Sequence, residues 1–438
     1  MQPIAEDEGV LPPLSVRRAL VATFRRIVRL YFREVERVGV APAADTRGRV
    51  FVANHHNALI DPILVLTDAA CEISPIAKST LWNIPGLRWL LDRAGAVPIV
   101  RRKDSPDKAQ GANDETFEKI AAHLAGGGNI LIFPEGTSHS EPQLAPLRTG
   151  AARMLVAAAE RGGVPPTFQA VALEFDARDD FRSRSLVLWG PVRALADVRG
   201  TGEDRVHAIT EQMDADLREL LVEGGTHDER LLVARVAEML ANDAGDASLS
   251  GWSTIGRQVE HAGRVLREAS PSMVQHVQRH VAAYYAELAR FGLVDAQLAV
   301  ARAAVTKPRA RWLRRAALAP LAVPGFALYA IPYFIPRMIA RKSDTDAVST
   351  VKLGAALVVY PLWAAGLVSL SFVLLPPPLS LGAAAVVIAS PFAALSWLDA
   401  YWNRTPEHEA TPEDLARLAR LRIAARTAID EARARLPA

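Results

Sequence analysis

The sequence predicts an α/β domain in which helices flank a mixed sheet, followed by a helical section and a C-terminal transmembrane helical hairpin. From about residue 48 to 192, short β-like runs alternate with helical stretches, which is typical of a sheet covered by helices. From about 202 to 310, strand patterns are absent and residues recur at helical periods. Beyond 311, the apolar residues are concentrated in long uncharged stretches. We therefore divide the chain into segments 1–47, 48–200, 201–310, 311–404 and 405–438.

The composition limits the class of protein. Half of the 438 residues are hydrophobic, although 23% are charged, so we expect the apolar residues to cluster. The net charge of +3 argues against a nucleic-acid partner for the whole chain. The single cysteine, Cys71, excludes an intrachain disulfide and a multi-cysteine metal site. The N-terminus has no basic segment followed by an apolar core, and we expect no signal peptide.

Segment 1–47 contains a predicted basic amphipathic helix over residues 15–39. Apolar residues recur at three- and four-residue spacing beside arginines at every fourth position: Val16, Leu20, Phe24, Ile27, Tyr31 and Val38, with Arg25, Arg29, Arg33 and Arg37. Such a helix could lie on an anionic membrane surface. It could also be a surface helix packed on the domain, and both interpretations stay open.

Segment 48–200 carries the predicted sheet. Apolar, β-rich runs predict its strands, and periodic stretches between them predict its helices. The strands are expected at 50–53, 96–100, 129–133, 169–173 and 186–189, and the helices at 62–70, 112–125 and 149–161.

Segment 311–404 is the predicted membrane region. Residues 353–375 and 379–398 are uncharged, each is long enough to cross a hydrocarbon core of about 30 Å, and three prolines join them as a hairpin. Residues 316–335 are also uncharged, but three prolines interrupt them, a fourth follows at 336, and basic residues flank both ends. Because basic flanks favour the cytoplasm, we expect a re-entrant or interfacial segment there rather than a full span.

The remaining two segments carry no evident chemistry. Segment 201–310 is predicted to be helical. Segment 405–438 is a predicted helix that begins after Thr411 as N-cap, with Pro412 at the first helical position. Its arginines favour the cytoplasmic side.

The first cluster of candidate catalytic residues follows the strand at 50–53 and contains His55, His56 and Asp61. Active groups of α/β folds gather at the carboxyl ends of strands. A histidine can take a proton from an attacking hydroxyl, and a carboxylate can hold that histidine in the required tautomer. The alternative is structural, because Asp61 before Pro62 would also suit a helix N-cap.

Two more clusters follow predicted strands. Glu135, Gly136 and Thr137 form a turn after the strand at 129–133, and Arg148 follows nearby. Backbone amides in such a turn, with a hydroxyl and an arginine, suit a phosphate or an oxyanion. The alternative is an ordinary strand-ending turn. Three consecutive cations that begin at Arg101 follow the strand at 96–100 and could attract a phosphate, although such runs are ordinarily solvated loops.

In combination, these clusters resemble the motifs of the glycerol-phosphate and lysophosphatidate acyltransferase superfamily, in the family's order, over about residues 30–195. The histidine–aspartate block looks like the first motif, Gly95 to Arg101 like the second, and Phe133 to Thr137 like the third, which is the most specific. The strand around Val171 is a weak fourth motif without the usual second proline spacing, and Ser138 stands where many members have arginine. Three further stretches resemble fungal-type glycerol-3-phosphate acyltransferases: 31–39, 77–81 and 181–183.

The resemblance implies a membrane-bound O-acyltransferase of phospholipid biosynthesis. A fatty acyl group would pass from acyl-CoA or acyl-carrier protein to glycerol 3-phosphate or to a lysophospholipid such as lysophosphatidate. The catalytic domain would lie on the cytoplasmic face of a phospholipid membrane, and no metal or cofactor would be needed beyond the acyl donor.

The resemblance also implies roles for individual residues. The first-motif histidine would be the general base and Asp61 would orient it. The usual spacing to the aspartate selects His56, whereas the usual Asn-His pair selects His55; we favour His55 and keep both. Because neither spacing brings ring and carboxylate together on a straight helix, we expect the histidine in a loop and Asp61 at a helix start. The acceptor phosphate would be bound by Arg101, Glu135, Gly136 and Thr137, with help from Arg148.

Two other functions stay open as alternatives. One is a non-catalytic lipid-binding or scaffold protein with the same fold, against which the intact histidine–aspartate pair argues. The other is a hydrolase, against which the absence of a Gly-x-Ser-x-Gly elbow argues.

Overall fold

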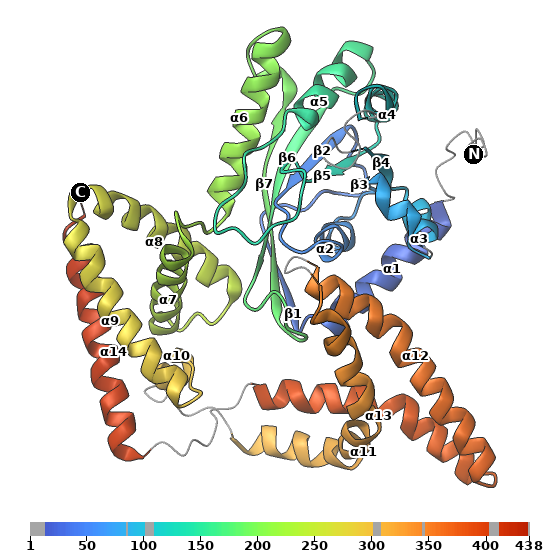
Figure 1. Ribbon diagram of the computed structural model, residues 1–438, viewed down its shortest axis with the longest axis vertical. Coiled ribbons are helices and arrows are strands. Elements are labelled where there is room, and N and C mark those ends of the chain that lie inside the picture. Colours follow the sequence, from blue (N-terminus) through green and yellow to red (C-terminus); the bar gives the residue numbers. More distant parts are fainter. Residues whose placement is uncertain are drawn as a thin grey trace. The chain divides into compact units, whose positions relative to one another are not determined.

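The computed structural model describes residues 14–84, 86–100, 109–300, 308–343, 347–402 and 411–436. The chain divides into two compact units, Met1–Glu223 and Gly224–Ala438, which are described separately. Figure 1 labels their helices and strands.

The first unit is built on a seven-stranded sheet in the order β1-β7-β6-β2-β5-β3-β4. Only β6 and β7 pair antiparallel, and every other pair is parallel, which confirms the predicted mixed sheet. The strands are β1 (Glu34–Val38), β2 (Arg49–Ala53), β3 (Ser74–Lys78), β4 (Val97–Ile99), β5 (Ile130–Ile132), β6 (Thr167–Phe175) and β7 (Arg184–Ala194).

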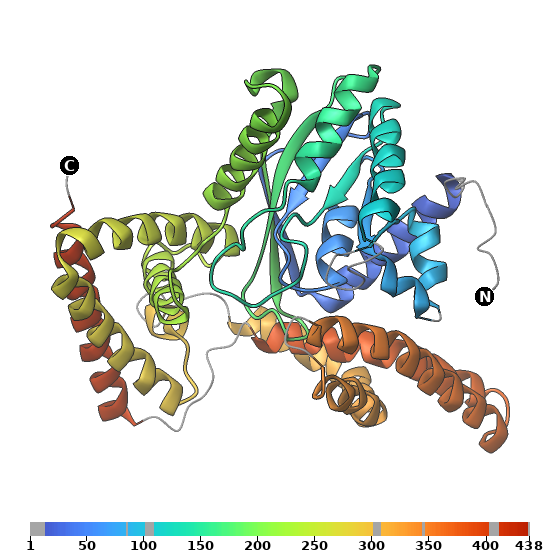
Figure 2. The same ribbon diagram turned by 45° about the horizontal axis from the view of Figure 1, so that its top comes forward.

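Helices cover both faces of this sheet (Figure 2). The crossovers β2-α2-β3 and β5-α5-β6 run in opposite directions along the sheet, so right-handed connections place α2 and α5 on opposite faces. Helices α1 and α3 join α2, and α4 and α6 join α5. The helices are α1 (Leu14–Tyr31), α2 (Ile60–Asp68), α3 (Leu87–Ala94), α4 (Ala109–Ala125), α5 (Gly150–Arg161) and α6 (Gly202–Leu220).

The central strands are buried on both faces and form the core of the unit. All residues from Val50 to Ala53 in β2 are buried, as are all three residues of β5. A strand covered by helices on both sides has apolar residues at consecutive positions rather than at alternate ones. This pattern explains why the short apolar runs in the sequence correctly predicted β2, β5, β6 and β7. Strand β4 was also predicted, although it lies at the edge of the sheet and is not buried.

Two strands escaped the sequence prediction. The expected helix over 15–39 is wrong beyond Tyr31, because residues 34–38 form β1 and pair with β7. Apolar residues at helical spacing can still form a strand where a neighbouring strand, here β7, provides backbone hydrogen-bond partners. Strand β3 was missed because Ser74–Lys78 contains a proline and only one β-branched residue.

Helix α1 packs on the first unit. Val28 and Tyr31 are buried, and the Arg25 Nε donates a hydrogen bond to the Thr67 carbonyl at 2.9 Å. Arg17 is also buried, with its guanidinium hydrogen-bonded to Ile73 O and Ser74 Oγ. The packed surface helix is therefore the interpretation that the structure shows, and contact with a membrane stays a prediction.

The second unit contains a helical bundle. Helices α9 and α14 pack along each other and share a core with α7; its members include Met239, Val277, Val281, Leu288, Leu418 and Ile429. Helix α14 begins with the predicted cap, in which Thr411 and Asp414 form a capping box. The helices are α7 (His227–Asp243), α8 (Leu249–Ala269), α9 (Pro271–Arg290), α10 (Asp295–Val300) and α14 (Pro412–Arg433).

Three further helices are long and apolar enough to cross a membrane, over Ala316–Ala340, Val348–Leu374 and Leu379–Asp399. They belong to α11 (Pro308–Ala340), α12 (Val348–Leu374) and α13 (Leu379–Trp402). The last two form the predicted hairpin. Helix α11 is continuous through its four prolines, so its length fits a full span; the expected re-entrant or interfacial placement of 316–335 stays a prediction.

Candidate active site

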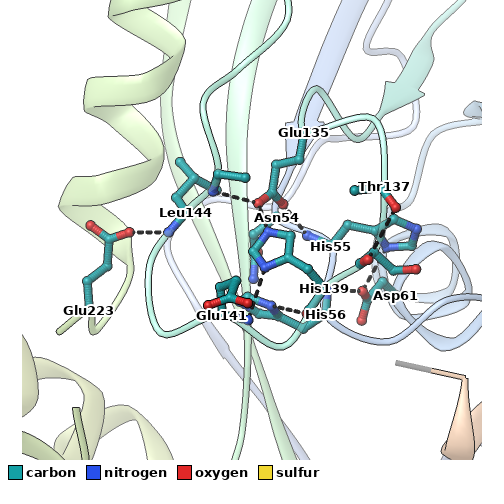
Figure 3. Close-up of polar contacts among 12 residues, drawn as sticks. Asn54, His55, His56, Asp61, Glu135, Thr137, His139, Glu141, Leu144 and Glu223 are labelled. Carbon is teal, nitrogen blue, oxygen red and sulfur yellow. Dashed lines mark hydrogen bonds and ion pairs between the residues drawn. The ribbon is translucent and has the colours of Figure 1, made fainter. Parts of the chain in front are cut away.

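The candidate site lies where β2 and β5 end. These neighbouring strands are parallel, with Val52 opposite Ile132, so the residues that follow them emerge side by side. We call residues 54–59 the histidine loop and residues 133–148 the glutamate loop. Sheet pairing thereby joins two motifs about 80 residues apart in the sequence, as the backbone amide of His55 and the Glu135 carboxylate show (Figure 3).

His55 and Asp61 form a close pair. The His55 Nδ1 lies 3.0 Å from the Asp61 Oδ2, and the aspartate side chain is completely buried. Because a carboxylate only accepts hydrogen bonds, Nδ1 carries the proton and donates it. The Nε2 atom of His55 then has a lone pair, which is the tautomer required of a general base.

Asp61 also organises the backbone of the histidine loop. Its Oδ2 accepts from the backbone amides of His56 at 2.8 Å and Asn57 at 2.7 Å. The residue is the second of α2, and the N-cap position belongs to Leu59, which makes no side-chain cap. The N-cap interpretation of Asp61 is therefore wrong, because the carboxylate turns back over the loop. As expected, the histidines lie in a loop and the aspartate at a helix start.

His56 has a different environment from His55. Its Nδ1 donates to the backbone carbonyl of His139 at 3.1 Å, and its side chain is buried. The His55 side chain is 17% exposed and stacks on Phe133, with ring centroids 4.1 Å apart. His55 therefore combines a carboxylate partner with access from outside, whereas the His56 side chain is buried.

Glu135 lies inside the glutamate loop, with its side chain buried. One carboxylate oxygen accepts from the His55 amide at 2.7 Å; the other accepts from the Ala145 amide at 3.0 Å and contacts His139 Nε2. Burial disfavours the charged carboxylate, but the His139 and backbone hydrogen bonds outweigh it and lower the pKa of Glu135 below its usual value. Glu135 is thus an ionised group inside the protein rather than on the surface of the site.

The structure brings Gly136 and Arg148 together, and Thr137 follows Gly136 in the chain. Gly136 has φ of +75°, and a Cβ atom there would lie 2.6 Å from Arg148 Nε, so the arginine packs directly on the glycine backbone. The Arg148 amide donates to the Pro134 carbonyl at 2.9 Å, which closes the loop. Arg148 is exposed beside this turn, where a cation can meet an anionic ligand.

Arg101, the remaining predicted site residue, lies outside the described residues, as do Arg102 and Lys103. The described chain stops one residue after β4, at Val100.

Sequence reasoning missed two residues of the site. His139 lies between the two loops, and Arg178 donates to the His56 carbonyl and to Ser140 Oγ, at 3.1 Å in each case. Both had a positional signal. His139 follows Glu135 by four residues, and Arg178 follows the carboxyl end of β6, the other parallel neighbour of β2.

Comparison with known proteins points to acyltransferases. The sequence model of the acyltransferase family matches residues 34–172. The chain is 24% identical to glycerol-3-phosphate O-acyltransferase 2 of Saccharomyces cerevisiae, over 57% of this chain and 37% of the yeast protein. It is 26% identical to the chloroplastic 1-acyl-sn-glycerol-3-phosphate acyltransferase BAT2 of Brassica napus, over 31% of this chain and 36% of that protein.

Two further similarities are weaker or shorter. The chain is 30% identical to a lyso-ornithine lipid O-acyltransferase of Pseudomonas aeruginosa, over 28% of this chain and 43% of that protein. The crystal structure of the 1-acyl-sn-glycerophosphate acyltransferase PlsC of Thermotoga maritima matches 46% of this chain and 81% of its own, with 16% identity. Its TM-score of 0.33 is too low to carry an argument. The matches span 36% to 43% of the length of these three curated relatives.

Proposed function

We propose that this chain, whose residues 34–172 form an acyltransferase-family domain, transfers a fatty acyl group from acyl-CoA or acyl-carrier protein to the hydroxyl of glycerol 3-phosphate or of a lysophospholipid such as lysophosphatidate. The observation that carries the proposal is the contact of 3.0 Å between His55 Nδ1 and Asp61 Oδ2. It combines a buried carboxylate with a partly exposed imidazole at the carboxyl ends of β2 and β5.

The proposed reaction is direct transfer with His55 as the general base. The His55 Nε2 takes the proton of the acceptor hydroxyl, and the oxygen attacks the thioester carbonyl carbon. A tetrahedral oxyanion forms and collapses, so that the new C–O bond remains and the C–S bond breaks. The imidazolium, stabilised by Asp61, then returns its proton to the sulfur of the leaving thiol. These steps need no covalent acyl-enzyme and no metal.

The acceptor phosphate is proposed to bind at the turn around Gly136. Arg148 supplies a charged donor there, Thr137 a hydroxyl, and the resemblance adds Arg101. Glu135 supports this site through its position in the turn. Its carboxylate is buried and negative and would repel a phosphate, so we assign it no direct contact with the acceptor.

A membrane location completes the proposal. The three long apolar helices support membrane attachment, and the basic residues at both ends of the uncharged stretch 316–335 favour a cytoplasmic position for the catalytic unit. In that location, a lipid acceptor in the bilayer and a thioester donor in the cytoplasm reach the same site.

The experiment that tests the function is acyl transfer by the full-length protein purified in detergent. Acyl-CoA and acyl-carrier protein are offered separately as donors. The acceptors are glycerol 3-phosphate, lysophosphatidate and lyso-ornithine lipid, with glycerol as the control that lacks a phosphate. We expect transfer to at least one phosphate-bearing acceptor and none to glycerol. Transfer to lyso-ornithine lipid alone would contradict the proposed phosphate contact, and absence of transfer to every acceptor would favour the lipid-binding alternative.

Alanine variants of the two adjacent histidines form a matched pair for the mechanism. His55→Ala is expected to lower kcat by about 100- to 10,000-fold, the usual contribution of a general base. His56→Ala is expected to lower kcat by less than about 10-fold, because its ring contacts a backbone carbonyl. A reversed order of the two effects would make His56 the base. Arg148→Ala should raise the KM of the acceptor and leave that of the donor unchanged.

A further inference from the structure

The backbone of His55 is held from both sides by the glutamate loop. Its amide donates to Glu135 Oε1 at 2.7 Å, and its carbonyl accepts from the His139 amide at 3.1 Å. These contacts are separate from the pairing of its ring with Asp61. The position of the imidazole therefore depends on two residues that hold the backbone of His55.

Glu135 and His139 are joined to each other. The His139 Nδ1 accepts a hydrogen bond from the Glu141 amide at 3.2 Å, so the ring proton lies on Nε2, which donates to Glu135. The Glu135 side chain is fully buried and that of His139 is 13% exposed. A buried carboxylate with such a donor keeps one orientation, because loss of the donor would leave it unsatisfied.

His139 also contacts the second histidine of the histidine loop. Its carbonyl accepts from the His56 Nδ1 at 3.1 Å, and the two rings lie edge to face with centroids 5.3 Å apart. Figure 3 shows His139 between His56 and Glu135, and His55 beside Asp61. A single residue of the glutamate loop thus anchors the His56 ring and the backbone of His55.

We propose that Glu135 and His139 form a positioning pair that sets the backbone of His55, so that its ring meets Asp61 and presents Nε2 to the acceptor hydroxyl. This inference rests on the proposed function. The pair touches neither the acceptor nor the acyl group. Its effect is geometric, and a misplacement of about 1 Å in a reacting group can lower a rate about 100-fold.

Two polar variants of His139 that differ by one methylene test the proposal. In His139→Gln, the side-chain amide nitrogen reaches the position of Nε2 and can still donate to Glu135, whereas in His139→Asn it is too short. We expect His139→Asn to lower kcat by about 10- to 100-fold and to change the KM of donor and acceptor by less than about 3-fold. His139→Gln should recover kcat to within about 5-fold of the wild type.

Glu223→Ala is the matched control for loosening of the glutamate loop. The Glu223 Oε1 accepts from the Leu144 amide at 2.6 Å, next to the Ala145 amide that binds Glu135. This variant releases the loop without touching the contacts of His55, so kcat should change by less than about 3-fold. An equal loss of kcat in Glu223→Ala and His139→Asn would overturn the proposal in favour of general loop order.

Two further results would also overturn the proposal. A raised acceptor KM in both His139 variants would make His139 a binding residue. If the fall of kcat/KM on the acid side of its pH profile disappears in His139→Gln, His139 is the general base itself.

A readout without turnover keeps this inference separate from the proposed function. Diethyl pyrocarbonate modifies accessible neutral imidazoles, and peptide mass spectrometry gives the rate at His55. We expect modification of His55 to be several-fold faster in His139→Asn than in the wild type, in His139→Gln or in Glu223→Ala, because the ring leaves Asp61. Equal rates in all four proteins would overturn the positioning pair even if the wild type transfers acyl groups. Faster modification in His139→Asn alone would support it even if none of the acceptors is used.

Discussion

In the described part of the chain, Asp61 of the first unit and Asp295 of the second are aspartates without exposed surface, and each is held by several donors. The donors of Asp61 come from His55, His56 and Asn57, all within six residues along the chain. The donors of Asp295 come from three other helices: Asn242 of α7, Tyr284 of α9 and Arg422 of α14.

The two carboxylates differ in how completely they are satisfied. Asp295 uses both oxygens: Oδ1 accepts from Tyr284 at 2.6 Å and from Arg422 at 2.8 Å, and Oδ2 from Asn242 at 2.9 Å. Asp61 uses only Oδ2, and its Oδ1 is buried with no hydrogen-bond partner in the described part of the chain. A buried carboxylate with an unpaired oxygen is stabilised more by a positive charge that forms beside it than a fully hydrogen-bonded one is.

The charge of the partner differs as well. Burial opposes the charge on Arg422, yet its hydrogen bonds to Asp295 and Asp243 raise its pKa, so it is a permanent cation. His55 gains its charge only when it takes a proton, and its side chain is accessible. A similar burial of aspartate thus accompanies a structural clamp in the second unit and the proposed reactive pair in the first, and the two pairs differ in the titratability and exposure of the partner.

The largest expected effect breaks the reactive pair. In Asp61→Asn, the amide oxygen takes the place of Oδ2, but the neutral amide no longer stabilises the imidazolium of His55, and kcat should fall by about 1,000- to 10,000-fold, as in other histidine–aspartate pairs. The unfolding midpoint should change little, because the amide oxygen still accepts from the loop amides. Activity above about a tenth of the wild type would show that Asp61 orders the loop without orienting the base.

The second effect breaks the structural clamp. In Arg422→Met, Asp295 loses its cation while it stays buried, which should destabilise the helical bundle by about 3–5 kcal/mol. The kcat measured well below the unfolding transition should match the wild type. Urea unfolding followed by proteolysis near α14 measures the change. The double variant with Asp295→Asn should recover part of the loss, and a fall in kcat would contradict the separation of the two roles.

The smallest expected effect is on the stability of the first unit at acid pH. Because the folded pKa of Glu135 is lowered, its contribution to stability is fully present above the ordinary glutamate pKa and is lost as the pH falls through the folded value. Glu135→Gln should therefore flatten the acid side of a plot of melting temperature against pH below about 4.5. Glu141→Gln, an exposed glutamate of the same loop, is the control and should leave that slope unchanged.

Several features of the fold and the site could be predicted from the sequence because they depend on neighbouring residues. Consecutive apolar residues at 50–53 and 130–133 indicated burial on both faces and predicted β2 and β5. The lengths of the uncharged stretches predicted the hairpin of α12 and α13. The positions of His55 and Asp61 after a strand, together with the third motif, predicted where the site would be.

Other features were decided only by the tertiary structure. Strand β1 exists because β7 offers it a pairing edge, and the difference between His55 and His56 follows from which ring meets Asp61 and which meets His139. The Arg422–Asp295 pair joins residues 127 positions apart. The periodicity of apolar residues along the chain indicates which residues are buried. The order of strands and helices in space decides which other residues they contact. The sequence alone therefore determined the strands of the site and its candidate residues, and the order of the sheet decided which of them meet.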